Sequence, residues 1–230
     1  MNTFNRDPPE STGPRAAQRD ATRAAILAAA RLAFEADSFD GANIRDIAAR
    51  AGVAAGTVIH HFGDKRELLH AALHDDLQQR VLDGALLVLA DDRDAGVDVG
   101  ASLSRLASAV CGHYASRPSL SRAALRESLF ADAPWAERFA AQTSATHRAV
   151  VDVIDAARAR GAVAATVDPT LAAAAWLSFF YFGLIGWTQG QLASPVSFID
   201  ALTRQHLGLP TATTTTTTTT PDDASPRSPP

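Results

Sequence analysis

Cysteine and lysine are nearly absent from this sequence. Among 230 residues there is one cysteine, Cys111, and of 21 basic residues only Lys65 is a lysine. A single cysteine excludes an intramolecular disulfide framework and a zinc site built from cysteines. It also fits a protein of a reducing compartment. We interpret the excess of arginine over lysine as codon bias.

An excess of basic charge is also lacking. Lys and Arg number 21 against 25 Asp and Glu, so the formal net charge is −4. This balance excludes a globally basic coat for nucleic acid but allows a local basic face. The hydrophobic share of 47% is enough for a well-buried core.

Long apolar runs are absent, with one exception. Residues 171–187 are almost entirely apolar, and their length lies at the lower limit for crossing a bilayer. No basic cluster flanks the run, and Asp168 followed by Pro169 is typical of a helix start. We therefore expect a helix buried on all sides, with no membrane as partner. Residues 1–20 hold no apolar segment of a secretory signal, so we expect a cytoplasmic protein.

Alternation of apolar and polar residues at period two is missing, whereas helical periodicity is nearly continuous. The sequence therefore predicts an all-α fold. Residues 1–18 and 210–230 are rich in proline or threonine, and we expect both ends to be disordered. Turn residues divide the remainder into nine expected helices: 20–36, 43–50, 54–61, 64–90, 100–116, 119–131, 134–160, 169–191 and 196–207.

Two short expected helices form a helix-turn-helix pattern. Asn43 is a suitable N-cap for the first, whose apolar residues recur at helical spacing on one face. Gly52 follows as the residue that ends the helix, where a positive φ costs glycine little. Val53 fills the corner, and Ala48 is small enough for the second helix to approach closely. A helix, a tight glycine turn and a helix within twenty residues is the pattern of many DNA-binding proteins.

The second helix can be oriented from its own residues. Val58 and Phe62 lie at i and i+4 and are expected to face the core. His60 then lies almost opposite them, flanked by Gly56 and Thr57. This slim polar face suits the major groove of DNA. Further cations that would face phosphates follow Asp64, the expected cap of the next helix, or precede the motif: Lys65, Arg66, Arg15, Arg19 and Arg23.

Residues 22–34, 44–53, 56–58, 61–62 and 64–69 strongly resemble the DNA-binding domain of the TetR (tetracycline repressor) family. The resemblance implies a homodimeric, ligand-released and mostly repressing transcription factor. It places the helix-turn-helix domain at 19–66 and a helical ligand-binding and dimerisation domain at 67–209.

By position, the resemblance implies DNA contacts by eight residues: Arg45, Ala55, Gly56, Thr57, Ile59, His60, His61 and Lys65. Arg45 and His60 would read bases, and Thr57, His61 and Lys65 would bind phosphates. The sequence departs from the family at Ile59, where a tyrosine is usual, and at Ala54 and Ala55, where polar residues are common. These side chains offer only apolar contacts.

The resemblance also implies an effector cavity in the larger domain. Candidate lining residues, chosen among clustered aromatic and polar side chains, are His113, Tyr114, Trp135, Phe139, Trp176 and Phe180. Such a cavity suits a small, largely apolar effector. Helices 169–191 and 196–207 would form the homodimer, with Gly183 and Gly186 allowing close approach. Two reading helices about 34 Å apart imply a pseudo-palindromic operator in double-stranded DNA.

Other chemistry has little support. His70 and His74 lie at i and i+4 and could hold a metal, but solvated surface histidines are the preferred interpretation. Cys111 could sense oxidants, although a small core residue is preferred. No fingerprint of catalytic residues or of a nucleotide cofactor occurs, so we expect no enzyme, metal or cofactor. The alternative is a helical small-molecule-binding protein or enzyme whose helix-turn-helix is vestigial.

Overall fold

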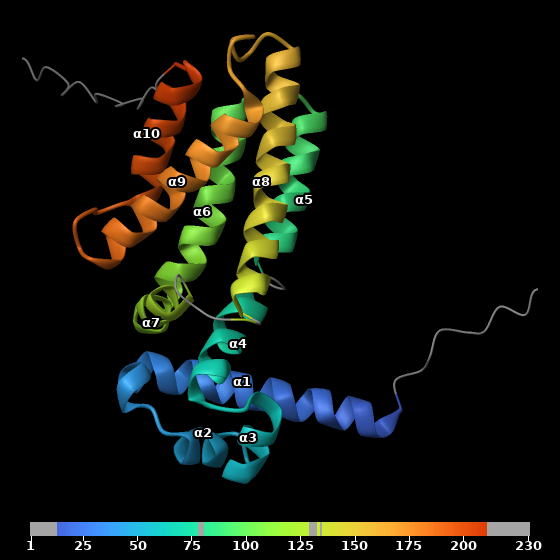
Figure 1. Ribbon diagram of the computed structural model, residues 1–230, viewed down its shortest axis with the longest axis vertical. Helices are drawn as coiled ribbons and strands as arrows, with labels where there is room; N and C mark the ends of the chain where they lie inside the picture. The colour runs from blue at the N-terminus through green and yellow to red at the C-terminus, as the bar shows by residue number, and fades with distance from the viewer. Residues whose placement is uncertain (1–12, 78–80, 129–132, 134, 211–230) are drawn as a thin grey trace, which may run out of the picture.

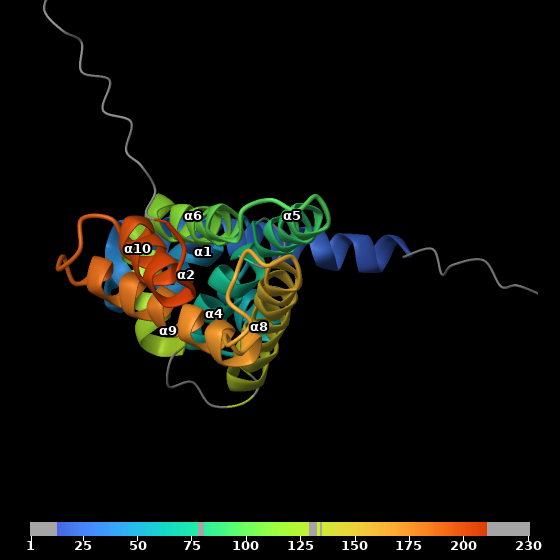
Figure 2. The same ribbon diagram turned by 90° about the horizontal axis from the view of Figure 1, so that it is seen from above.

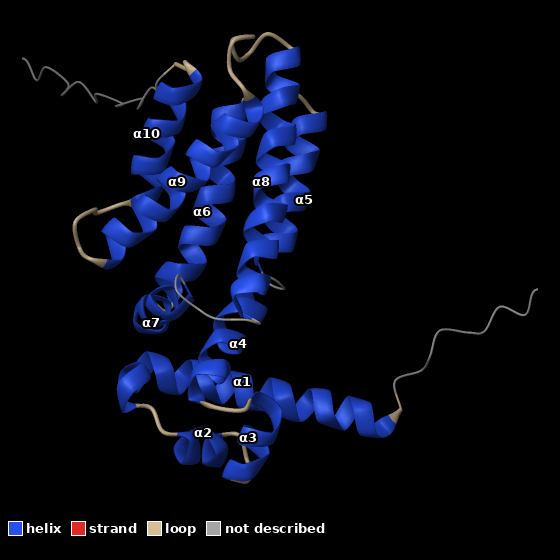
Figure 3. Ribbon diagram, viewed as in Figure 1, coloured by secondary structure: helices blue, strands red, loops and turns tan. Residues whose placement is uncertain are grey.

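The computed structural model describes residues 13–77, 81–128, 133 and 135–210, and all their regular structure is helical (Figure 3). The expected all-α class is therefore confirmed. The helices in this part of the chain are α1 (Pro14–Gly41), α2 (Ile44–Arg50), α3 (Ala55–Phe62), α4 (Lys65–Leu77), α5 (Asp83–Asp94), α6 (Val99–Ser116), α7 (Pro118–Ser128), α8 (Trp135–Ala159), α9 (Pro169–Thr188) and α10 (Pro195–Leu207).

One expectation about helix boundaries is wrong. Part of the N-terminal arm, expected to be disordered over 1–18, is helical because α1 already begins at Pro14. Residues 1–12 and 211–230 lie outside the described residues. The helix expected over 64–90 is described on both sides of residues 78–80, as α4 to Leu77 and α5 from Asp83, and residues 78–80 also lie outside the described part of the chain.

The helices enclose two separate cores. In Figure 1, α1, α2 and α3 form a small lower unit, and α4 leads from it toward the larger bundle of α5, α6, α8, α9 and α10. The small core runs from Ile26 to Ala72 and also takes in Leu120, Ala123 and Trp135. The large core begins at Leu73. The division between the cores thus falls inside α4, a few residues beyond the expected domain boundary at 66/67.

Helix α9 packs between neighbours but is not buried on all sides. Gly183 and Gly186 face the same chain: an added Cβ would lie 3.1 Å from Ile199 and 2.9 Å from Leu192. The close approach expected at a dimer face is therefore made within one protomer, against α10 and the turn before it. By length and composition α9 could also cross a membrane, although here 39% of its most apolar window is buried inside the protein.

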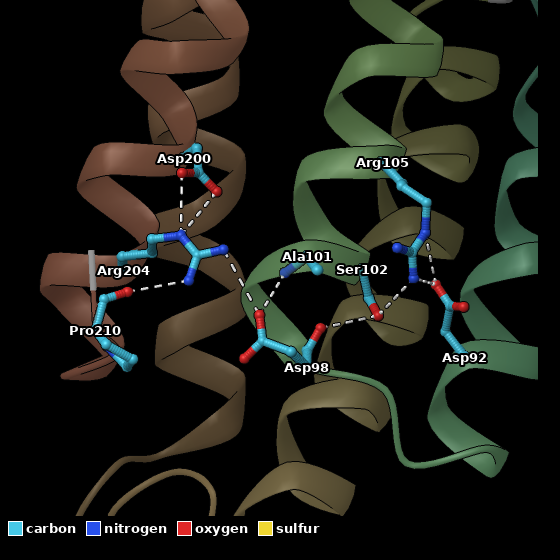
Figure 4. Close-up of polar contacts among 8 residues, drawn as sticks. All are labelled: Asp92, Asp98, Ala101, Ser102, Arg105, Asp200, Arg204 and Pro210. Atoms are coloured by element: carbon cyan, nitrogen blue, oxygen red, sulfur yellow. Dashed lines mark hydrogen bonds and ion pairs between the residues drawn. The ribbon is translucent and has the colours of Figure 1, made fainter. Parts of the chain in front are cut away.

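A polar network joins α10, α6 and α5 at the end of the bundle (Figure 4). The guanidinium of Arg204 contacts Asp200 on its own helix at 3.0 Å and Asp98 at 3.6 Å. Asp98 caps α6 by accepting from the Ala101 amide at 2.8 Å. Arg105 on α6 pairs in turn with Asp92 on α5. Viewed from above in Figure 2, α9 and α10 lie at the opposite side of the bundle from α5, so this network ties the two sides together through α6.

Candidate DNA-binding surface and effector cavity

The turn between α2 and α3 has the geometry expected from its sequence. Asn43 caps α2 by accepting a hydrogen bond from the Arg45 amide at 2.8 Å. Gly52 adopts a φ of +71°, a conformation that favours glycine. The Val53 amide then donates to the carbonyl of Ala48 at 3.0 Å, which closes the turn. The predicted helix-turn-helix is thus present in the structure.

Helix α3 presents the predicted polar face. Val58 and Phe62 are buried in the small core, as expected. On the opposite face His60 is exposed, and Thr57 is half-buried beside it. Ile59, a large apolar side chain, is 46% exposed on this helix. The exposed face therefore combines polar contacts with one apolar side chain.

Four basic side chains gather where α1 crosses α3. The Arg23 guanidinium lies 5.3 Å from the centre of the Phe62 ring, and the rings of His60 and His61 are 5.9 Å apart. The pKa of His61 is lowered from its ordinary value, first by burial and then by the charges of His60, Arg19 and Arg23. An anion placed here would relieve this repulsion, as a DNA phosphate does.

Lys65 and Arg45 differ in their surroundings. Arg45 is exposed at the first turn of α2. The Lys65 ammonium donates to the carbonyl of Ala42 at 3.1 Å and to that of Asp40 at 3.4 Å. It also lies 4.7 Å from the centre of the Phe39 ring. Lys65 therefore stabilises the end of α1, a role that its sequence position did not indicate.

A small cavity of about 40 Å³ lies in the larger bundle. Its walls come from α4, α6, α8, α9 and the start of α5, through Leu77, Leu82, Leu106, Val110, Tyr114, Phe139, Gln142, Thr143, Thr146, Trp176, Leu177, Phe180 and Tyr181. Four of the six predicted lining residues are among them: Tyr114, Phe139, Trp176 and Phe180.

The other two predicted lining residues, His113 and Trp135, lie elsewhere. His113 is half-buried with its ring edge-on to Tyr114. Trp135, at the start of α8, is part of the small core. Its ring stacks on His70 at 5.2 Å, and its indole N–H donates to the carboxylate of Glu67. Trp135 therefore connects α8 to α4 and does not line this cavity.

Sequence reasoning missed the polar lining of the cavity. Gln142, Thr143 and Thr146 follow Phe139 at spacings that place all four on one face of α8. That periodicity was visible in the sequence and could have identified them. Leu77 and Leu82 could not be found this way, because they lie outside α8 and their local sequence does not distinguish them from ordinary core leucines.

Helix α7 connects the cavity to the small core. The buried Ser121 hydroxyl donates to the carbonyl of Tyr114, a cavity residue, at 2.8 Å. At the other side, the Glu35 carboxylate on α1 accepts from the amides of Ser119 at 3.4 Å and Leu120 at 3.0 Å. These amides belong to the first turn of α7, whose N–H groups have no partner within the helix. Cavity, α7 and α1 thus form one connected path.

The sequence also suggested metal-binding histidines and a redox-sensing cysteine, and the structure gives each a different outcome. His70 is 1% exposed, so the preferred interpretation of solvated surface histidines is wrong for it. The His74 side chain and Phe130 lie outside the described residues, and those that are described contain no cluster of metal-ligating side chains. Cys111 is a buried core residue, as preferred, and burial raises the pKa of its thiol to about 12. It is therefore protonated at neutral pH and poorly reactive.

The small unit and the first part of α4 resemble known sequences. Residues 26–72 match the family model of bacterial regulatory proteins, tetR family. The HTH-type transcriptional repressor AcnR of Corynebacterium efficiens is 36% identical over 55 residues, which make up 24% of this chain and 29% of that protein. The match thus spans less than a third of this curated relative's length.

Solved structures resemble the whole arrangement of helices. A TetR-family transcriptional regulator from Rhodococcus sp. aligns with a TM-score of 0.57 and 24% identity, over 82% of this chain and 99% of that one. The transcriptional regulator FadR from Bacillus subtilis, crystallised with stearoyl-CoA, aligns with a TM-score of 0.59 and 16% identity, over 80% and 97%. The structural likeness shows a shared fold, and the family model of the tetR regulators matches the segment of this chain that holds the helix-turn-helix, residues 26–72.

Proposed function

We propose that the protein is a cytoplasmic, homodimeric transcriptional repressor that binds a pseudo-palindromic operator and is released by a small effector. The observation that carries this proposal is the helix-turn-helix of α2 and α3, within the segment matching the family model. Its buried Val58 and Phe62 leave a polar face on α3 for the major groove. The description of AcnR as a repressor favours repression over activation.

Base reading is assigned to Arg45 and His60, both of which are exposed. Phosphate contacts are assigned to Thr57, His61 and Lys65, which are half-buried beside the core. The half-buried Ala55, the exposed Gly56 and the apolar Ile59 would lie against the groove. In this arrangement Ile59 is available to a thymine methyl group.

The second copy of the chain is assigned to an exposed stripe on α9. Leu171, Ala174, Ser178 and Phe182 recur at helical spacing and are all exposed. Leu171 is 69% and Phe182 61% exposed, far more than large apolar residues in a monomer usually are. Phe182 also packs on Phe198 of α10, with ring centres 5.7 Å apart. An isologous contact of α9 and α10 with their copies would bury this stripe.

Effector release would begin at the cavity. At about 40 Å³ the cavity is far smaller than the roughly 300–1,000 Å³ of sites for drug-sized ligands. A ligand that occupies it must therefore push its walls apart. One wall is Leu77, at the end of the helix whose first half packs in the small core. Opening the cavity would move α4 and change the spacing of the two reading helices, to the extent that the effector prefers the open conformer.

The proposal is tested by fluorescence anisotropy of the full-length protein on DNA from its own upstream intergenic region, with scrambled DNA as the control. Preferential binding that weakens linearly with log salt is expected. In the same assay, Thr57→Ala should weaken binding and Ile59→Tyr should strengthen it. Equal, weak binding to both DNAs, followed by no enrichment in a selection from genomic fragments, would overturn the regulator in favour of a ligand-binding protein with a vestigial helix-turn-helix.

A further inference from the structure

A buried hydrogen-bond donor in the cavity wall has no partner. Trp176 is 3% exposed and lines the cavity. Among the described residues its indole Nε1 is the one buried side-chain nitrogen or oxygen atom that makes no hydrogen bond. Leaving such a donor unsatisfied costs about 1–3 kcal/mol. Native proteins rarely accept this cost without a functional reason.

The neighbouring side chains bring no acceptor to this donor in the structure. The Phe180 ring stacks on Trp176 with a centroid separation of 5.7 Å and an angle of 21°. The hydroxyls of Thr143 and Tyr181 pair with each other at 3.2 Å. The Thr146 hydroxyl donates to the backbone carbonyl of Gln142 at 3.1 Å. These hydroxyls keep acceptor lone pairs, but none reaches the indole N–H of Trp176 in this structure, so a molecule that enters the cavity can supply the acceptor.

The charge of the lining limits what that molecule can be. The residues that line the cavity include no Asp, Glu, Lys, Arg or His. Burial raises the pKa of Tyr114 and of Tyr181, so both phenols stay neutral. A carboxylate or phosphate placed here would lose its hydration without gaining a cation. A neutral acceptor does not incur that loss.

We propose that the effector is a neutral, largely apolar molecule with an acceptor oxygen, of the ketone, ester or ether class, that accepts a hydrogen bond from the indole N–H of Trp176. This inference rests on the proposed effector site and specifies its ligand class. It makes Trp176 the residue that determines specificity, because the donor is satisfied only by ligands that carry such an oxygen. A purely hydrocarbon ligand fills the same space but leaves the N–H unpaired.

The test uses two probes of nearly the same shape. Acetophenone carries a carbonyl oxygen where α-methylstyrene carries a methylene group, so only the first can accept from Trp176. Isothermal titration calorimetry on the full-length protein gives the ratio of the two dissociation constants. Because the two probes differ in hydrophobicity, the informative quantity is the change of this ratio between wild type and Trp176→Phe. We expect a change of about tenfold, the value of one buried hydrogen bond.

Trp187→Phe is the matched control, since Trp187 lies on the same helix but does not line the cavity. It should leave the ratio of dissociation constants unchanged. A second readout needs no mutation of the donor: the indole N–H resonance of Trp176, assigned in ¹H–¹⁵N spectra, should shift downfield with acetophenone and not with α-methylstyrene. This spectrum also covers the case in which Trp176→Phe does not fold.

The outcomes separate the inference from the proposed function. An unchanged ratio in Trp176→Phe, with no downfield shift of the Trp176 resonance, overturns the acceptor inference while leaving a ligand cavity in place. Absence of binding by either probe overturns it too, together with the effector part of the proposed function. Operator binding, measured separately by anisotropy, is affected by neither result.

Discussion

At the scale of single residues, basic side chains crowd together around α3, and their mutual repulsion disfavours the protonated form of His61. His61 lies near His60, Arg19 and Arg23, and their charges together with burial hold its pKa below the ordinary value of about 6.5. At neutral pH His61 is therefore mostly neutral in the unbound protein. A phosphate against it would reverse these effects, raise the pKa and favour the protonated form.

Operator binding should accordingly take up a proton at His61. Because the complex then holds more protons than its components, affinity should rise as the pH falls from about 7.5 to 6, by up to about tenfold per pH unit. His61→Gln should flatten this profile, whereas His147→Gln, on α8 in the larger bundle, should keep it. Anisotropy titrations at several pH values measure both. Identical profiles for wild type and His61→Gln would remove His61 from the interface.

Substitutions of Thr57 and Lys65 should differ in their effect on the free energy of unfolding. Lys65 holds two carbonyl groups at the end of α1, so Lys65→Ala should lower the free energy of unfolding by about 1 kcal/mol as well as weaken operator binding. No side-chain hydrogen bond to the protein is recorded for Thr57 among the described contacts, and Thr57→Ala should weaken operator binding by about fivefold with little change in stability. Chemical denaturation and anisotropy on the same samples test this pair. Equal stability of the two variants would contradict the role given to Lys65.

At the scale of elements, α7 is held near both ends by polar contacts to α1 and α4. Glu35 accepts from two amides of its first turn, and Arg66 on α4 pairs with Glu127 near its other end at 3.1 Å. The Ser121 hydroxyl meanwhile binds the carbonyl of Tyr114 in the cavity wall. A shift of α6 caused by a ligand would therefore be transmitted through α7 to α1.

Glu35→Ala should loosen this connection. The amides of Ser119 and Leu120 would lose their acceptor, so their protection from hydrogen exchange should fall by about fivefold, equivalent to about 1 kcal/mol. Asp37→Ala removes an exposed acidic residue from the same helix and is the matched control. Site-resolved hydrogen exchange measures both variants. Unchanged protection at these two amides would show that other contacts hold α7.

Local signals in the sequence identified most of the helices and their caps. Asn43, Gly52 and Asp64 cap or end helices through contacts within a few residues, so the helix-turn-helix could be predicted. The start of α1 was missed although Pro14 occupies the first helical position, as Pro169 does in α9. That signal was present but was assigned to a disordered arm.

Contacts between distant residues were beyond such reasoning. His70 and Trp135 are 65 positions apart and stack only because α8 begins against α4. Aromatic character alone suggested a ligand site for Trp135 and gave no indication of this contact. The grouping of Leu77 with Tyr114 and Phe180 around the cavity likewise depends on helices that are distant in the sequence. Residue type therefore predicted the kind of surface, whereas the partners of each side chain required the tertiary structure.

At the scale of the whole molecule, the exposed stripe on α9 is the proposed contact between two copies of the chain. If it forms the dimer, it also fixes the distance between the two copies of α3. Phe182→Arg places a charge at the C-terminal end of the stripe formed by Leu171, Ala174, Ser178 and Phe182 on α9. We expect sedimentation analysis to show a monomer. Operator affinity should fall by about a hundredfold, because each half-site then binds alone.

The matched control is Leu87→Arg, since Leu87 is an equally prominent apolar side chain, 68% exposed, but lies on α5 across the bundle from α9 and α10 (Figure 2). It should remain dimeric and bind the operator as wild type does. A monomer produced by Leu87→Arg and not by Phe182→Arg would move the dimer interface to α5. In that case the two copies of α3 would no longer be placed by α9 and α10, and the half-site spacing of about 34 Å would have to be set by the opposite side of the bundle.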